Sequence, residues 1–254
     1  MVTTIYDFIS WPFYAAIQRP RKRLRASRED KASLVSREGG LTYRSAVPIN
    51  YLHLELNQNN ICTLEQAFTY ALKKHGKNRC LGSREIINEE DETQPNGKVF
   101  KKLVMGDYIW KTYAEVDKLA ACFSTGLELL GLKPRDRIAI FADTRAEWLI
   151  AAMAAFRINL TVVTLYATLG DEAVEHGLNQ TEVKYVLTTH DLLPKFKSIL
   201  KNVPNVKTMI YMEDPLHKTE VSGFKEGVLI HSFCDVIATG NRDKRRISLI
   251  KGIC

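Results

Sequence analysis

Residues 137–165 read RIAIFADTRAEWLIAAMAAFRINLTVVTL, and this stretch decides the fold class. RIAIFA at its start, residues 137–142, and TVVTL at its end are short apolar runs with β-branched residues, which are typical of buried strands. The residues between them are apolar over most of a helical surface, and Thr144 and Glu147 have the spacing of an N-terminal capping box. A strand, a helix and a second buried strand in this order predict a parallel βαβ unit.

The same alternation continues toward the C-terminus. Thr168 and Asp171 are placed to open a helix that runs through Leu178. Further strands are expected at residues 185–189 and 206–211, with an amphipathic stretch at residues 192–200 between them. Short apolar runs separated by helices favour the α/β class, with a parallel sheet flanked by helices on both faces.

Two amphipathic helices are expected ahead of this sheet. The first follows Thr63, an N-cap residue, and ends near Gly76. The second covers residues 113–130, where Gly131 closes it and Pro134 prevents its continuation. Residues 24–60 are polar and mixed, and we expect them to be irregular.

Between these helices, residues 84–105 form two strand-like runs around the sequence EEDETQPNGK. Pro95-Asn96-Gly97 is a strong turn signal, so a hairpin or a long loop is predicted. The acidic run from Glu89 to Glu92 is most simply a solvated loop tip.

The positive charge of the chain is concentrated in two runs. The 254 residues carry a net charge of +7, with six basic and no acidic residues from Arg19 to Arg28, and five basic residues and Asp243 from Arg242 to Lys251. The rest of the chain is slightly acidic. A protein that binds nucleic acid usually has a basic stripe on its folded body, so a nucleic-acid partner is not expected.

The first basic run follows an aromatic, apolar segment, and together they predict contact with membrane lipid. The segment contains Asp7, Ser10 and Pro12, and is too short and interrupted to span a bilayer. Tryptophan and tyrosine favour the headgroup region, and neighbouring cations are attracted to anionic lipid. The alternatives are a transit peptide, although those are usually richer in serine, and an N-terminal arm that packs on its own domain. The candidate membrane-contacting residues are Phe8, Trp11, Phe13, Tyr14, Arg19, Arg21, Lys22, Arg23 and Arg25.

Sequence motifs for catalysis are absent from the 254 residues. There is no GxGxxG and no GxSxG, and the spacing of Gly126 and Gly131 resembles a phosphate loop only until Leu132 replaces its lysine. Five cysteines without CxxC spacing exclude a zinc ribbon and a disulfide framework. From the residues alone, we assign no catalytic, cofactor-binding or metal-binding residue.

Four stretches together resemble the long-chain fatty acid–CoA ligases of the adenylate-forming superfamily. The first also resembles the animal subgroup that includes the arachidonate-preferring form. In order, the stretches are GSREIINEEDETQPNGKVFKK at Gly82–Lys102, YIWKTYAEV at Tyr108–Val116, IAIFADTRAEWLIAAMAAF at Ile138–Phe156 and VTLYATLG at Val163–Gly170.

The resemblance implies ATP-dependent activation of a fatty acid, with magnesium and CoA serving the full-length enzyme. The glycine-rich phosphate loop of that family has no counterpart here, so we expect an N-terminal fragment or short isoform that is inactive alone and binds no cofactor. The expected divisions are a membrane-associating segment (1–28), a linker (29–60), an incomplete adenylate-forming N-terminal domain (61–240) and a divergent basic tail (241–254).

The resemblance leaves a second function open, a non-catalytic membrane-binding or pairing module that modulates the full-length enzyme. Expected partners are membrane lipid, long-chain fatty acid, and either a second copy or the full-length enzyme. The expected location is a cytosol-facing membrane, first the endoplasmic reticulum, with the mitochondrial outer membrane, the peroxisome and the lipid droplet as alternatives.

Overall fold

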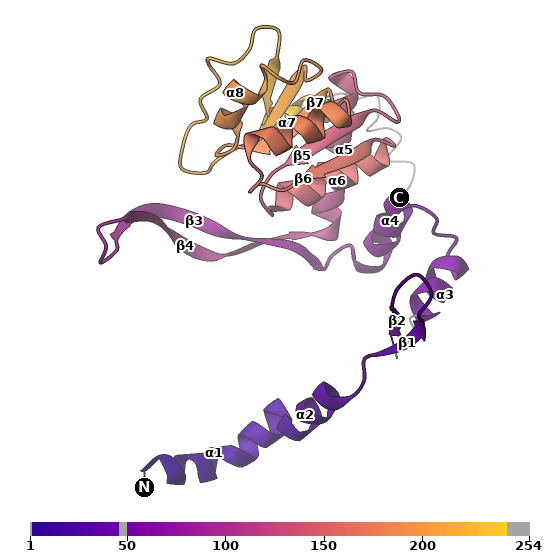
Figure 1. Ribbon diagram of the computed structural model, residues 1–254, viewed down its shortest axis with the longest axis vertical. Helices are drawn as coiled ribbons and strands as arrows, with labels where there is room; N and C mark the ends of the chain where they lie inside the picture. Colours follow the sequence, from indigo (N-terminus) through magenta and orange to yellow (C-terminus); the bar gives the residue numbers. More distant parts are fainter. Residues whose placement is uncertain (1, 46–49, 243–254) are drawn as a thin grey trace. The chain divides into compact units, whose positions relative to one another are not determined.

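The computed structural model describes residues 2–45 and 50–242, which fall into two units (Figure 1). One unit ends at Ile61 and the other begins at Cys62. Each unit is described by itself. The basic run beyond Arg242, and so almost all of the expected tail 241–254, lies outside the described residues.

The first unit contains more regular structure than its sequence suggests. Residues 29–60, expected to be an irregular linker, contain an antiparallel hairpin and a helix. The polar strands pair through their backbones and expose nearly all their side chains. The sequence therefore contains no hydrophobic pattern that predicts them. The elements are α1 (Val2–Gln18), α2 (Pro20–Arg28), β1 (Ala32–Ser36), β2 (Thr42–Ser45) and α3 (Asn50–Gln58).

The second unit is built on a five-stranded sheet in the order β6-β5-β7-β8-β9, in which every neighbouring pair is parallel. This confirms the parallel α/β prediction. β9 was not predicted. TVVTL, predicted as a buried strand, is instead the edge strand β6, and it exposes Thr161 and Thr164. The strands are β5 (Arg137–Phe141), β6 (Thr161–Leu165), β7 (Tyr185–Thr189), β8 (Thr208–Met212) and β9 (Leu229–Ser232).

Alternate residues of the central strands enter two separate cores. Ile138 and Ile140 of β5 contact one core, whereas Ala139 and Phe141 contact the other. Because successive side chains of a strand point to opposite faces, a sheet covered on both sides needs apolar residues at every position. RIAIF meets this requirement from its second residue onward, and those four residues are buried.

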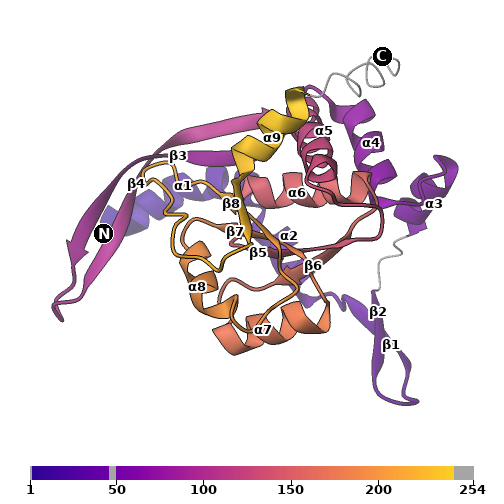
Figure 2. The ribbon, with the colours of Figure 1, turned by 90° about the horizontal axis from the view of Figure 1, so that it is seen from above.

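Helices cover both faces of the sheet, as Figure 2 shows. α5, α6 and α9 pack on the first face with α4 beside them, and α7 and α8 cover the second. The helices are α4 (Leu64–His75), α5 (Tyr113–Leu129), α6 (Ala146–Arg157), α7 (Asp171–Gln180), α8 (Phe196–Ile199), preceded by the short η1 (Leu193–Lys195), and α9 (Phe233–Arg242).

Capping explains where the helices begin. Thr63 and Gln66 form a full capping box at α4, as the N-cap prediction required, and Thr112 and Glu115 form another at α5. The capping box predicted from Thr144 and Glu147 is wrong. The N-cap of α6 is Arg145, and Glu147 instead accepts hydrogen bonds from the Arg145 guanidinium.

The predicted hairpin is confirmed but is longer than expected. β3 (Arg79–Thr93) and β4 (Val99–Thr112) form an antiparallel ribbon that projects from the rest of the unit (Figure 1). The acidic run Glu89–Glu92 was predicted as a loop tip and lies within β3. Opposite it, Lys101 pairs with Glu89, and Lys102 Nζ lies 3.5 Å from Glu92 Oε2. Cross-strand lysines therefore pair with two of the four acidic residues in a run that was predicted to be a loop.

α5 and α9 are in direct backbone contact through two glycines. A Cβ atom on Gly126 would lie 2.3 Å from the Val236 carbonyl oxygen, and one on Gly240 would lie 1.9 Å from the Cys122 carbonyl oxygen. Next to this crossing, the Phe123 and Phe233 rings stack at 4.3 Å between centroids. The contact holds α9, the helix after β9, on the first face of the sheet.

We therefore predict that Gly126→Ala and Gly240→Ala each lower the free energy of unfolding by about 2–3 kcal/mol, since the added methyl groups force the helices apart. Helix propensity acts in the opposite direction, because alanine is favoured over glycine by about 1 kcal/mol. Urea unfolding followed by circular dichroism measures the difference. Gly170→Ala is the control for steric overlap, since its Cβ would meet nothing within 4 Å; because Gly170 is the N-cap of α7, any loss of stability there is a capping effect. Equal unfolding midpoints for Gly126→Ala and Gly170→Ala would contradict the prediction.

Candidate functional site at the carboxyl edge of the sheet

The carboxyl edge of the parallel sheet is the candidate functional site. The chain leaves β5 toward β6 through α6 on the first face and returns to β7 through α7 on the second. The order therefore has a topological switch point between β5 and β7, and open α/β sheets bind their ligands at the carboxyl ends of the strands beside such a point.

A charged network connects three segments along this edge. Arg145, before α6, donates to both carboxylate oxygens of Glu147 at 3.2 and 3.0 Å, and to the Glu213 backbone carbonyl at 3.1 Å. The Glu213 carboxylate, just past β8, accepts a hydrogen bond from the Cys234 backbone amide at 2.9 Å. Because Cys234 lies in the first turn of α9, Glu213 stabilises the positive end of that helix. The network joins the β5–α6 turn, the end of β8 and the start of α9.

The network determines the protonation of its members. Burial alone would raise the pKa of Glu147, but the bidentate hydrogen bonds from Arg145 outweigh it and hold that pKa below its usual value. Cys234 is exposed, but partial desolvation of its thiol, reinforced by the Glu213 carboxylate, raises its pKa to about 11. Cys234 is consequently a protonated thiol at neutral pH and is not an activated nucleophile.

The loop between β8 and β9 is held on the same edge by polar contacts. Asp214 Oδ1 accepts hydrogen bonds from the backbone amides of Leu216 and His217 at 2.8 and 2.7 Å. Burial acts to raise the Asp214 pKa, but the hydrogen bonds outweigh it and hold that pKa below its usual value. His190, which follows β7, forms a 2.8 Å hydrogen bond with Thr219, and its ring stacks on that of His217. These histidines hold the loop, and among the described residues no group of His, Cys, Asp and Glu is arranged for a metal ion.

Sequence reasoning missed three buried polar atoms in the sheet. The hydroxyls of Thr188 and Thr189, at the carboxyl end of β7, and Nε2 of His231 have no hydrogen-bond partner among the described residues. Leaving a buried polar group unpaired costs about 1–3 kcal/mol. Two polar residues ending an otherwise apolar strand, YVLTT, were the only signal in the sequence.

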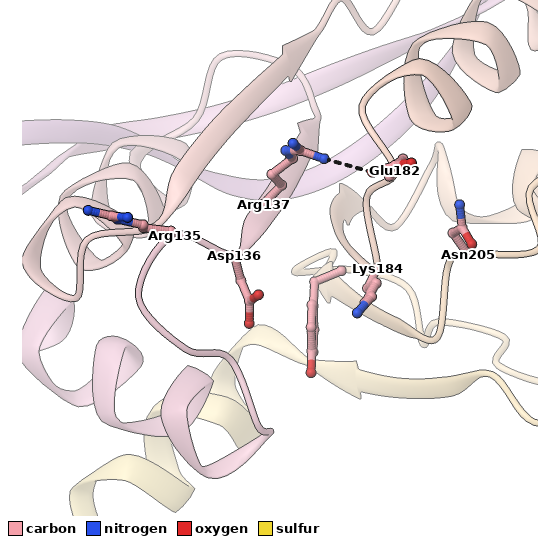
Figure 3. A pocket seen from close by; sticks show the side chains of 7 residues that line it. Arg135, Asp136, Arg137, Glu182, Lys184 and Asn205 are labelled. Carbon is pink, nitrogen blue, oxygen red and sulfur yellow. Dashed lines mark hydrogen bonds and ion pairs between the residues drawn. The ribbon is translucent and has the colours of Figure 1, made fainter.

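A polar cavity of about 340 Å³ lies at the opposite, amino edge of the sheet, where β5 and β7 begin (Figure 3). Arg137 donates to Glu182 at 3.3 Å and Asp136 accepts from the Lys133 backbone amide, so both carboxylates have partners. Figure 3 shows the Arg135 and Arg137 side chains pointing in different directions. The cations do not converge on a common point, and we assign no ligand to this cavity.

The structure places some of the predicted membrane-contacting residues around one cavity and the others outside it. Phe8 lies within α1, and the side chains of Trp11, Phe13 and Tyr14 are 53%, 69% and 49% exposed. A cavity of about 450 Å³ at the junction of α1 and α2 is lined by Trp11, Ala15, Arg19, Pro20, Arg21 and Lys22. The further predicted residues Arg23 and Arg25 are exposed on α2 and do not line it. Within the described residues, no helix has the length and apolar character needed to cross a bilayer.

Residues 88–239 match the family described as AMP-binding enzyme. The chain belongs to this family, and the match runs from the middle of β3 to α9.

Long chain acyl-CoA synthetase 8 of Arabidopsis thaliana is 42% identical over 152 residues, which are 60% of this chain and 21% of that protein. Long-chain-fatty-acid--CoA ligase 1 of Schizosaccharomyces pombe is 30% identical over 68% of this chain and 27% of its own length. The chain thus spans about a quarter of the length of these relatives.

Solved structures share the fold. The adenylation domain of a carboxylic acid reductase from Segniliparus rugosus superposes with a TM-score of 0.58 at 18% identity, covering 78% of this chain and 33% of that one. The corresponding domain from Mycobacterium chelonae gives 0.57 at 17% identity, covering 77% of this chain and 31% of that one.

We predict that Cys234 reacts with iodoacetamide at pH 8 at least about tenfold more slowly than free cysteine, because a thiol with a pKa of about 11 holds little thiolate there. Glu213→Gln is expected to lower this pKa and speed the reaction while keeping an oxygen that accepts from the Cys234 amide. Glu220→Gln, on the same loop, is the matched control. Mass spectrometry of the alkylated peptide as a function of pH measures the rate, and a midpoint below pH 9 would refute the assignment.

Proposed function

We propose that this chain supplies the N-terminal part of a long-chain fatty acid–CoA ligase. In the proposed reaction, the fatty acid carboxylate attacks the α-phosphorus of ATP, giving an acyl-adenylate and diphosphate. The CoA thiolate then attacks the acyl carbon and releases AMP. The observation that carries the proposal is the family match over residues 88–239, together with relatives named as long-chain acyl-CoA synthetases.

In this proposal, the carboxyl edge is a wall of the reaction site rather than the whole of it. The unpaired hydroxyls of Thr188 and Thr189 support this role, since they leave polar groups at the switch point without partners. The charged network supports this role by positioning. The hydrogen bonds made by Arg145, Glu147 and Glu213 within the network hold the β5–α6 turn in place. Rigid positioning of substrate supplies much of the rate of such transfers.

The described carboxyl edge does not fit a triphosphate or its magnesium ion unaided. Arg145 is already bound to Glu147, and Glu213 to the amide of Cys234. Adenylation needs donors and cations aimed at the charge that develops on the phosphates. We therefore propose that the 254-residue chain does not catalyse adenylation by itself, and we derive no step through ATP, magnesium or CoA on its residues.

The isolated chain is expected to form no acyl-adenylate and no acyl-CoA from labelled ATP, magnesium, CoA and either oleate or arachidonate. A purified long-chain acyl-CoA synthetase serves as the positive control, and thin-layer chromatography with mass spectrometry detects the products. Turnover that co-purifies with the chain and changes with Arg145→Ala would refute the proposal, because a contaminating ligase would not respond to that variant.

The ribbon β3–β4 favours a second candidate function, that of a non-catalytic pairing module. It exposes apolar residues along much of its length: Ile87, Val99, Phe100, Leu103, Met105, Tyr108, Ile109 and Trp110. Exposed apolar surface of this extent is typical of a surface that another protein covers. Adding the chain to the full-length synthetase separates the candidates, since a pairing module changes the activity of the enzyme and an inert domain does not.

The acyl-chain preference of the proposed ligase is tested separately from its reaction. Gly82–Lys102, the stretch that resembles the arachidonate-preferring animal subgroup, lies on the ribbon β3–β4. The relatives described above are a plant protein and a fission-yeast protein, both named for long chains. Comparing oleate with arachidonate in a ligase that carries this ribbon tests the preference.

We also propose that the N-terminal segment contacts the cytosolic face of a membrane, first that of the endoplasmic reticulum. The exposed aromatic residues of α1 and the exposed cations of α2 support this proposal, because such residues favour the lipid interface and anionic headgroups respectively. The mitochondrial outer membrane, the peroxisome and the lipid droplet are alternatives that fluorescence microscopy of the tagged chain distinguishes.

Liposome co-sedimentation is expected to show binding that is stronger on anionic than on neutral lipid and that falls as salt rises, since salt screens the cations of α2. Replacing Trp11 and Phe13 with alanine is expected to weaken binding about tenfold by removing apolar burial. Replacing Tyr43, an exposed aromatic residue on β2, is the matched control. Equal sedimentation with and without residues 1–28 would exclude membrane contact through this segment.

A further inference from the structure

The α1–α2 junction has an unusual backbone. Arg19 adopts the left-handed conformation, with φ 46° and ψ 55°, and Pro20 follows it at the first position of α2. The residue before a proline is biased away from the right-handed helical region, and although α1 runs through Pro12, Arg19 leaves that region and ends the helix. The Arg19 amide still donates to the Ala15 carbonyl at 3.1 Å, while its own carbonyl accepts from the amides of Lys22 and Arg23. One residue therefore ends α1 and begins α2.

This junction brings apolar and cationic side chains to one cavity. We call it the hinge notch, and it is lined by Trp11, Ala15, Arg19, Pro20, Arg21 and Lys22. Trp11 and Ala15 come from the second half of α1 and are apolar, whereas Arg19, Arg21 and Lys22 are cationic. Trp11 lies against Tyr14, with 5.7 Å between ring centroids, and both are partly exposed.

Acidic residues flank the segment that forms the hinge notch, Asp7 before it and Glu29 and Asp30 after it, but are absent within it. Residues 10–28 contain no aspartate or glutamate, and none of the three cations takes part in a described ion pair. Like charges gathered at one cavity repel one another, and an anion bound there relieves the repulsion. The notch therefore has the charge complement of a compact anion.

The apolar side of the hinge notch points to an amphiphilic anion. Exposed Tyr14, which lies against Trp11, extends the apolar surface of α1 beside the notch, so a ligand with its charged head in the notch would have the start of its tail against Trp11 and Tyr14. Two guanidinium groups and an ammonium provide many donors in a small volume, which suits the several oxygens of a phosphate better than the two of a carboxylate. A volume of about 450 Å³ is large enough for a headgroup.

We propose that the hinge notch binds the phosphate monoester headgroup of an anionic membrane lipid such as phosphatidate. The inference deepens the membrane contact proposed above and depends on it. α1 lies in the interface with its aromatic side chains among the lipids, and the notch selects a phosphate monoester over other headgroups of equal charge. The outer cations of α2, Arg23, Arg25 and Arg28, attract any anionic surface without selecting a headgroup.

The chain allows a test with two variants of equal charge. Arg19→Gln/Arg21→Gln/Lys22→Gln removes three cations from the hinge notch, and Arg23→Gln/Arg25→Gln/Arg28→Gln removes three from the same helix outside it. Binding of the full chain is measured on phosphatidylcholine vesicles that contain phosphatidate, phosphatidylserine or oleate, matched for surface charge by electrophoretic mobility. Circular dichroism confirms that both variants keep the helix content of the wild type.

The wild type is expected to bind phosphatidate vesicles about fivefold more tightly than phosphatidylserine vesicles. The notch variant is expected to lose this ratio, whereas the outer variant keeps it while binding both vesicles more weakly. A wild-type affinity ratio near one, or an equal loss of binding in the two variants, would refute headgroup selection by the hinge notch. The proposal of membrane contact would still hold. No binding to any anionic vesicle would overturn both.

Two further arms identify the anion. A preference for oleate vesicles would assign the notch to a carboxylate and overturn the phosphate. Equilibrium dialysis with labelled glycerol 3-phosphate, without vesicles, is expected to show no binding. Binding there that the notch variant abolishes would assign the notch to a free phosphate and overturn the lipid.

Discussion

The backbone contact between α5 and α9 is the constraint on which the α/β unit depends. Gly126 and Gly240 allow the helices to approach until a single methyl group would overlap the opposite backbone. At that distance Phe123 and Phe233 stack, and Val236 enters the same core as Ile138 and Ile140 of the central strand. A helix at the beginning of the unit and a helix at its end are thereby joined over one face, and α9 holds β9, the strand that precedes it, beside β8.

The sheet held in this way has two chemically different edges. At the carboxyl edge, Arg145, Glu147 and Glu213 connect three segments, and polar groups of β7 stay unpaired. At the amino edge, Arg137 is bound to Glu182, and the Arg135 side chain points elsewhere (Figure 3). Parallel strands place all their carboxyl ends together, so the edge where turns can gather a substrate is set by topology. The chain belongs to the AMP-binding enzyme family, which agrees with the choice of the carboxyl edge as the candidate functional site.

The errors of the sequence analysis arise where the local pattern does not decide the structure, either because a partner lies far along the chain or because one pattern fits two arrangements. Glu89–Glu92 was predicted as a loop because the lysines that pair with Glu89 and Glu92 are on the returning strand. Glu147 read as a capping residue because its guanidinium partner, Arg145, occupies the N-cap position itself. Thr161–Leu165 read as buried because a β-branched composition does not distinguish an edge strand from a central one.

The sequence by itself determined the fold class and several elements: the central strand, predicted at residues 137–142, the helices predicted after Thr63 and over residues 113–130, and the segregation of aromatic and basic residues near the N-terminus. These depend on local periodicity and capping, which involve neighbours within a few positions. Only the tertiary structure decided the strand order, the switch point between β5 and β7, the contact of Gly126 with α9, and the grouping of Trp11 with Arg19, Arg21 and Lys22 around one cavity. Those features depend on which elements pack together and on one residue's backbone angle, and neither leaves a periodic signal in the chain.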